Sequence, residues 1–345
     1  MRGRGFTLIE MMVVLLIGTF LALAAFTLTA DMGRLRTGHI AALELHQNTR
    51  HALHLIETDL MNAGVGVGYL DDGSFAGIIE GSFEVAGGAT FVADDRALTG
   101  VDGALLTDDL GVRRALGERR TILALGEGTG ELCSGLSFDA DELVVASARS
   151  GVGSFALRID SSAAASCTRG LCAGGCTAIE WTADEEWSSS ADLSMDIFSA
   201  GDLFTEYATV VWFVTPDADG LGQLRRVASS QLDACTAVGM TCGAEVARGV
   251  EMLQYAVWWF DADTSTWTQA SQMAPLPGDV RLRVDLEIIA RARTDADAFK
   301  TVPIASQLAP GVCVPAPCGS DLDGVPRLVH RTTVEVRNAG LMRLR

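Results

Sequence analysis

The sequence predicts an α+β protein in which one long N-terminal helix packs on a strand-rich globular head. Residues 11–30 contain no formal charge, and an amphipathic pattern continues from there to about residue 63. From residue 70 onward, short apolar segments alternate with glycine-rich turns. The chain has 345 residues, which is long enough to bury a sizeable core. Together these features predict one N-terminal helix up to about residue 63, followed by a β-rich region.

The first expected element is a helix that is long and apolar enough to cross a membrane. At about 1.5 Å per residue, residues 11–30 span roughly 30 Å, the thickness of a bilayer core. Arg2 and Arg4 precede this segment, which favours a cytoplasmic N-terminus. The apolar run is longer than that of a secretory signal, and no polar region precedes a cleavage site. We therefore expect the helix to remain in the mature protein, with the head outside.

Glu10 lies at the edge of this apolar segment, where burying a carboxylate is costly. The stretch "RGFTLIEMMVVLLIG" resembles the class III signal of type IV prepilins and pseudopilins. The resemblance implies that a prepilin peptidase cleaves after Gly5 and N-methylates Phe6, and that Glu10 belongs to the same motif. The new α-amine of Phe6 would carry a charge at neutral pH, since its pKa is near 8. Glu10 would neutralise that amine, within its own chain or in a neighbouring subunit.

Beyond the apolar segment the helix is expected to become amphipathic and to end near Ala63. No proline occurs before Pro216, and Gly64 is the first of three closely spaced glycines that favour a helix end. The apolar positions of this part are Leu35, Leu43, Leu53, Ile56 and Leu60. Four histidines share it, namely His39, His46, His51 and His54. We interpret these as a solvated helix face, in preference to a metal site or pH sensor, because no further ligand type completes a set.

The head is expected to be built from short strands. Strand-like segments occur at 142–148, 154–159, 207–214, 223–229, 280–292 and 327–338. Stretches near 84–120 and 160–195 are rich in Gly, Ala, Ser and Asp, and we interpret them as inserts. The predicted organisation is a leader peptide at 1–5, a transmembrane helix at 6–30, its amphipathic continuation at 31–63, and a β-rich extracytoplasmic head at 64–345.

Several segments of the head resemble the PilW-like minor pilins. They are "HALHLIETDLMNAGVG", "VVWFVTPDADGLGQLRRV", "VARGVEMLQYAVWWFDAD" and the terminal "TTVEVRNAG". The matching positions include Asp59 and Glu251. The resemblance covers about half of the head, and the inserts have no counterpart in it.

The resemblance implies a minor pilin that primes or caps the assembly of a type IV pilus and has no catalytic activity. The alternatives are a type II secretion pseudopilin of the J kind and a pilus-associated surface adhesin. The implied partners are other minor and major pilins, the prepilin peptidase and the inner-membrane assembly platform. The expected location is the inner membrane, with a cytoplasmic N-terminus and a periplasmic head, and then the pilus at the cell surface.

The cysteines predict disulfide bonds in the head. Their number is even, and all follow residue 130: Cys133, Cys167, Cys172, Cys176, Cys235, Cys242, Cys313 and Cys318. A location behind a single apolar span favours an oxidising compartment. Zinc is the alternative for the cluster 167–176, although the chain has no CxxC pair. Bridges Cys235–Cys242 and Cys313–Cys318 would close the shortest loops.

Other classes of function have little support in the sequence. The net charge of −18 disfavours nucleic-acid binding, and no G-x-S-x-G, H-E-x-x-H or P-loop motif occurs. We therefore expect neither an enzyme nor a cofactor. Three acidic turns have carboxylates spaced as in calcium loops, at Asp217 and Asp219, Asp261 and Asp263, and Asp321 and Asp323. The favoured interpretation of each is a hairpin turn, and calcium, which related pseudopilins use, is the alternative.

Overall fold

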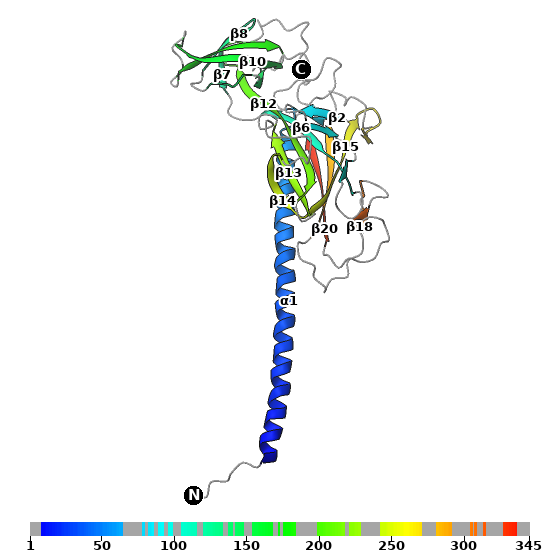
Figure 1. Cartoon of the computed structure of the whole chain (residues 1–345). Helices are drawn as coiled ribbons and strands as arrows, with labels where there is room; N and C mark the ends of the chain where they lie inside the picture. The colour runs from blue at the N-terminus through cyan, green and yellow to red at the C-terminus, as the bar shows by residue number, and fades with distance from the viewer. Residues whose placement is uncertain are drawn as a thin grey trace.

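The computed structural model consists of one long helix and a strand-rich head at its far end (Figure 1). It describes residues 8–64, 78–79, 82–85, 89–92, 96–98, 105–115, 120–133, 137–140, 142–147, 154–167, 172, 175–183, 199–217, 221–228, 242–270, 281–291, 304–305, 307–308, 313–314 and 327–336. The helix followed by a β-rich head is the arrangement that the sequence predicts.

Helix α1 spans Leu8–Met61, and most of its length extends away from the head (Figure 1). Gly64, just beyond it, has a positive φ of 71°, which a residue without a side chain adopts at little cost. The amide of Gly64 then donates to the carbonyl of Arg113 at 2.9 Å. The expected glycine at the end of the helix is therefore confirmed at Gly64. Its hydrogen bond places the residue next to β6 (Leu110–Ala115) of the sheet.

The strands follow in chain order. They are β1 Ile78–Ile79, β2 Ser82–Val85, β3 Ala89–Val92, β4 Arg96–Leu98, β5 Leu105–Thr107, β6 Leu110–Ala115, β7 Arg120–Gly126, β8 Thr129–Cys133, β9 Leu143–Ser147, β10 Ser154–Ala165, β11 Cys176–Ala183, β12 Leu203–Pro216, β13 Gly222–Ala228, β14 Ala244–Arg248, β15 Val250–Asp261, β16 Thr266–Gln269, β17 Leu282–Arg291, β18 Ile304–Ala305, β19 Cys313–Val314 and β20 Arg327–Val336. All six segments expected to be strands contain one. The predicted inserts near 84–120 and 160–195 include β6 and β11, which are members of the main sheet.

Strand β12 organises the larger, ten-stranded sheet, because its two halves pair with different neighbours. Its later half lies between β6 and β13, with Val210 opposite both Val112 and Ala228. Its first residues pair with β7 and β9, with Leu203 opposite Thr121 and Ser147. Strands β7 to β11 therefore form a lobe at the end of the head remote from the free end of α1 (Figure 1). We call β7–β11 the distal lobe.

A second, four-stranded sheet has the order β16-β15-β17-β20. Strands β17 and β20 pair along ten residues, from Leu282 opposite Val336 to Arg291 opposite Arg327. Strand β15 of this sheet also contacts the end of β5, which pairs with β4 in a small sheet of its own: the Leu253 backbone exchanges hydrogen bonds with the Thr107 hydroxyl at 3.1 and 3.2 Å.

The described residues of the head form two main hydrophobic cores. The larger is shared by α1 and both sheets, and it includes Leu53, Ile56, Leu60, Val210, Trp212, Met252 and Leu286. The smaller lies in the distal lobe and includes Ile122, Leu132, Phe138, Leu157, Ile179 and Phe204. Packing therefore explains the last part of the apolar stripe of α1, where residues 53, 56 and 60 face the larger core, whereas Leu35 and Leu43 are 55% and 61% exposed.

Candidate functional site

The first half of α1 is an apolar surface that the head does not cover. The segment is hydrophobic enough to cross a membrane, and none of its most apolar window is buried within the protein. Large side chains from Leu8 to Met32 are all more than half exposed. A soluble surface rarely exposes a continuous apolar stretch of this size, so another apolar phase or other subunits must cover it.

Glu10 lies in the first turn of α1, where the helix dipole favours a negative charge. Gly5 and Phe6 lie outside the described residues. Cleavage between them, and pairing of the new amine with Glu10, therefore stay predictions from the sequence.

The other end of α1 is fixed to the sheet by a buried carboxylate. Asp59 is 3% exposed and accepts hydrogen bonds from Trp212 Nε1 at 2.9 Å and Arg226 Nε at 2.9 Å. Its other oxygen lies 2.5 Å from Arg114 Nη1. Burial lowers the pKa of the Arg114 guanidinium, an effect that the charge of Asp59 opposes. One carboxylate therefore ties α1 to β6, β12 and β13, and we call these four residues the Asp59 clamp.

A second buried carboxylate network holds the four-stranded sheet. Glu251 lies 2.7 Å from Arg327 Nε and 3.4 Å from Arg291 Nε. The sequence had marked Asp59 and Glu251 only as family-like positions, and it did not predict their ion pairs. The sequence signal that could have indicated these ion pairs is an acidic residue on an otherwise apolar face of a helix or strand.

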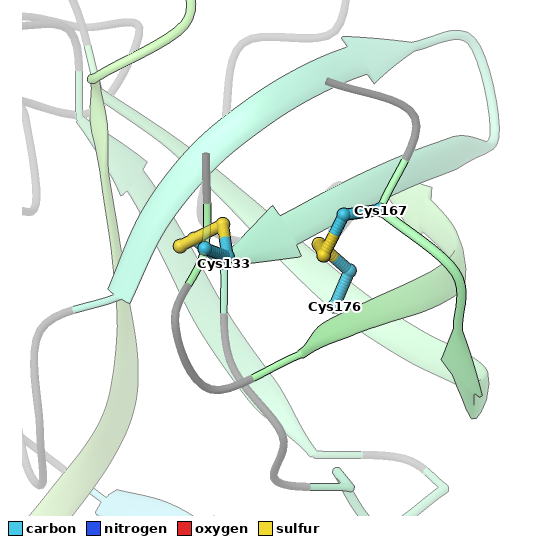
Figure 2. Close-up of a disulfide and its surroundings, with 4 residues drawn as sticks. Cys133, Cys167 and Cys176 are labelled. Atoms are coloured by element: carbon cyan, nitrogen blue, oxygen red, sulfur yellow. A yellow bond between two sulfur atoms is a disulfide. The ribbon is translucent and has the colours of Figure 1, made fainter. Parts of the chain in front are cut away.

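The disulfides predicted for the head are present in the distal lobe. Cys133 at the end of β8 is bonded to Cys172, and Cys167 after β10 is bonded to Cys176 at the start of β11 (Figure 2). The Cα atoms are 5.5 Å and 5.1 Å apart, respectively. Cys242 is also disulfide-bonded.

These bonds bear on the zinc alternative. The sulfur atoms of Cys167, Cys172 and Cys176 lie within 4.8 Å of one another. Each is bonded to another sulfur, so none is present as the thiolate that zinc requires. Cys235, Cys318 and the side chain of Cys313 lie outside the described residues, so the short-loop pairings proposed for them stay predictions.

Asp217 of the first acidic turn and all of the second, at 261–266, lie within the described residues, and in both an aspartate carboxylate accepts a backbone amide hydrogen bond. Asp217 Oδ1 accepts from the Leu221 amide at 2.8 Å. Asp261 accepts from the Thr264 hydroxyl at 2.8 Å and from the Asp263 amide at 2.9 Å, and these bonds lower its pKa. This geometry supports the turn interpretation. Asp219, Asp321 and Asp323 lie outside the described residues, and calcium binding stays a prediction.

One comparison with known proteins bears on the N-terminal motif. A family model for the prokaryotic N-terminal methylation motif matches residues 1–26, which include Gly5, Phe6 and Glu10. Among solved structures, the chain is similar to a type IV-like pilin from Thermus thermophilus, with 16% identity and a TM-score of 0.21. That match covers 59% of this chain and 87% of the other. The comparison with curated proteins gave no match.

Proposed function

We propose that this pilin-like protein, which carries a prepilin processing motif, is a minor pilin that primes or caps the assembly of a type IV pilus. The observation that carries the proposal is the combination of that motif with an uncovered apolar half-helix. Such a helix is held by the inner membrane before assembly and by other subunits afterwards. The head would then lie in the periplasm, and its partners would be other pilins, the prepilin peptidase and the assembly platform.

The distal lobe supports a position at the end of a filament. It extends the head on the side remote from the free end of α1 (Figure 1), and it has a hydrophobic core of its own. In a filament whose helices run parallel, another subunit would have to occupy the space above the head. A lobe in that space is compatible with a terminal subunit and obstructs a repeating one.

The function proposed for Glu10 is a charge contact between subunits. An unpaired ammonium at Phe6 would be strongly unfavourable in an apolar helical bundle. Pairing with Glu10 of a neighbour would remove that cost only when the two helices have the correct axial register. The same pair would therefore drive assembly and set its geometry.

The adhesin alternative has one specific observation in its favour. Trp258, Phe260 and Trp267 lie partly exposed on the β15–β16 hairpin, together with Arg281 and Arg283 of the neighbouring chain segment. However, the Arg283 guanidinium lies 4.8 Å from the Trp267 ring and 5.2 Å from the Trp258 ring. These cation–π contacts occupy ring faces that a ligand would need, so they favour a structural role.

Deletion of the gene, combined with labelling of the restored protein, tests the proposal. We expect the deletion to reduce filament number sharply and the label to mark one end of each filament. Label along the whole filament would instead indicate a major subunit. Normal filaments together with defective protein secretion would favour the pseudopilin alternative.

A further inference from the structure

A groove of about 670 Å³ lies between α1 and β20. Its helix side carries Arg50, His51 and His54, and its strand side carries His330 and Arg331. Five groups that are cationic or can become so thus converge on one concave surface. This concentration is unusual for a chain with a net charge of −18.

Of the two arginines of the groove, Arg50 is the one whose charge has no ionic partner among the described residues. Arg331 already pairs with the buried Glu287 at 2.5 Å. Glu57, the acidic residue of the groove, accepts a hydrogen bond from the neutral Thr332 hydroxyl at 2.8 Å and lies on the strand-facing side of the helix seven residues beyond Arg50. Arg50 makes no ion pair with any residue that the structure describes, and its side chain is exposed. The exposed guanidinium of Arg50 is therefore available to an anionic group from outside the chain.

The position of the groove excludes lipid headgroups as the source of that anion. Arg50 follows the last residue of the apolar segment, Ala30, by twenty residues. At 1.5 Å per residue, a continuous helix places it about 30 Å beyond the membrane core. Electrostatic attraction to a membrane surface decays within about 8 Å at physiological salt. A membrane lipid is therefore not the source of the anion, and the face of α1 that leads to the groove indicates a carrier instead.

The groove continues an exposed face of α1. Ile40 and Leu43 are 47% and 61% exposed, although they lie outside the expected membrane segment. Residues 40, 43, 47, 50 and 54 follow spacings of three and four and therefore share one helix face. The lower part of this face is apolar and the upper part is basic. A neighbouring subunit that covers the apolar part would reach the groove with its own head.

We propose that the groove receives a carboxylate-bearing segment of a neighbouring pilin-type subunit, with Arg50 as the principal charged contact. Guanidinium groups bind carboxylates through two parallel hydrogen bonds, which gives orientation as well as attraction. The contact rests on the proposed function, since it needs an assembly partner. The Arg50 contact would lie in the aqueous part of the interface between subunits. It would be a second point of recognition beside the proposed pair of Glu10 with the Phe6 amine.

Graded substitution of Arg50 tests this contact in cells. Arg50→Gln removes the charge and Arg50→Glu reverses it, and both residues are good helix formers. We expect co-purification of pilin subunits to fall several-fold with Gln and at least tenfold with Glu. Arg281→Gln and Arg281→Glu are matched controls, because Arg281 is 64% exposed and lies immediately before β17, at the opposite end of the β17–β20 pair from Arg327 and outside the groove. They should leave co-purification unchanged, and equal yields from the Arg50 variants and the wild type would overturn the proposal.

A binding assay with the purified full chain in detergent separates this inference from the proposed function. Hexaglutamate should bind the wild-type chain, bind at least tenfold more weakly to Arg50→Glu, and bind the Arg281→Glu control normally. Absence of hexaglutamate binding to the wild type would overturn the groove proposal, even if pilin capture were intact. Equally tight binding of inorganic phosphate would also overturn it, because the groove would then be a general anion site. Failure of the wild type to capture any pilin would instead count against the proposed function.

Discussion

The indole nitrogen of Trp212 donates a hydrogen bond of 2.9 Å to the carboxylate of Asp59, joining the end of α1 to the central strand of the head. Arg114 and Arg226 contact the same carboxylate from the flanking strands β6 and β13. The Asp59 clamp thus connects the segment expected to enter a filament with the domain that the filament would carry.

Substitution of Asp59 should destabilise the whole head. Asp59→Ala leaves two arginines without their partner, and breaking a buried ion pair in this way costs about 3–5 kcal/mol. The measurement is the free energy of unfolding in urea of the disulfide-intact protein. Asp285→Asn is the control, because its ion pair with Arg283 is partly exposed and should be worth less than about 1 kcal/mol. If both variants lowered the free energy of unfolding by a similarly small amount, the Asp59 clamp would not be important for stability.

The two disulfides of the distal lobe should contribute unequally. Cys133–Cys172 joins residues separated by 39 positions, whereas Cys167–Cys176 joins residues separated by 9. If bridges act mainly on the unfolded chain, removal of the longer one should cost about 1 kcal/mol more. The difference is measured by thermal unfolding of two double variants. One replaces Cys133 and Cys172 by serine, and the other replaces Cys167 and Cys176 by serine. A larger loss from the shorter bridge would show that strain or packing outweighs the loop-length effect.

Gly249 should not tolerate a side chain. Its φ is +79°, and a Cβ atom there would collide with the carbonyl oxygen of Arg291. Left-handed backbone alone costs an alanine about 1–2 kcal/mol, and the collision adds to that penalty. Gly126→Ala is the matched control, since its nearest neighbouring atoms would lie 3.9 Å away. Equal melting temperatures for the two variants would show that the β14–β15 connection adapts.

Glu10 should be needed for assembly and dispensable for insertion. Glu10→Ala deletes a charge, which makes the segment more apolar, and it leaves the Gly5–Phe6 bond in place. The variant should therefore enter the membrane and be cleaved, but it should fail to enter filaments or pilin complexes. Loss of a buried charge partner costs about 3–5 kcal/mol. Co-purification with other pilins and filament counts measure the effect.

The shorter carboxylate provides the finer test of Glu10. Glu10→Asp keeps the charge and shortens its reach by one methylene, so partial assembly is expected. Normal incorporation of the Glu10→Ala protein into filaments would show that Glu10 makes no essential contact with a neighbouring subunit. Glu10 would then be a processing residue or a partner of its own N-terminus.

The parts of the fold that could be predicted from sequence are those with a local signal. The charge-free segment and the glycine after Ala63 marked α1, and alternating apolar residues marked most of the long strands. The Asp59 clamp could not be predicted, because Arg226 is 167 residues from Asp59 in sequence. Nothing in a local pattern specifies which distant cation meets a buried acid.

The same limit applies to the sheet and to the cysteines. β12 reads as one continuous apolar strand, and its division between two sets of neighbours depends on long-range register. The even cysteine count predicted bridges in the head, but the pairing of Cys133 with Cys172 depends on how β8 and β11 align. The groove could not be predicted for a related reason. His330 and Arg331 are far from α1 in sequence and lie beside it only in the folded protein.

The mass of the mature protein shows whether the chain is processed as a pilin-type subunit. If the chain is a processed pilin-type subunit, intact-mass analysis of protein purified from native membranes will show loss of residues 1–5 and gain of one methyl group. Substitution of Gly5 by leucine should leave the precursor uncut, which provides the control. An N-terminus near residue 25 or 31, or a wild-type chain that keeps its first five residues, would contradict the account.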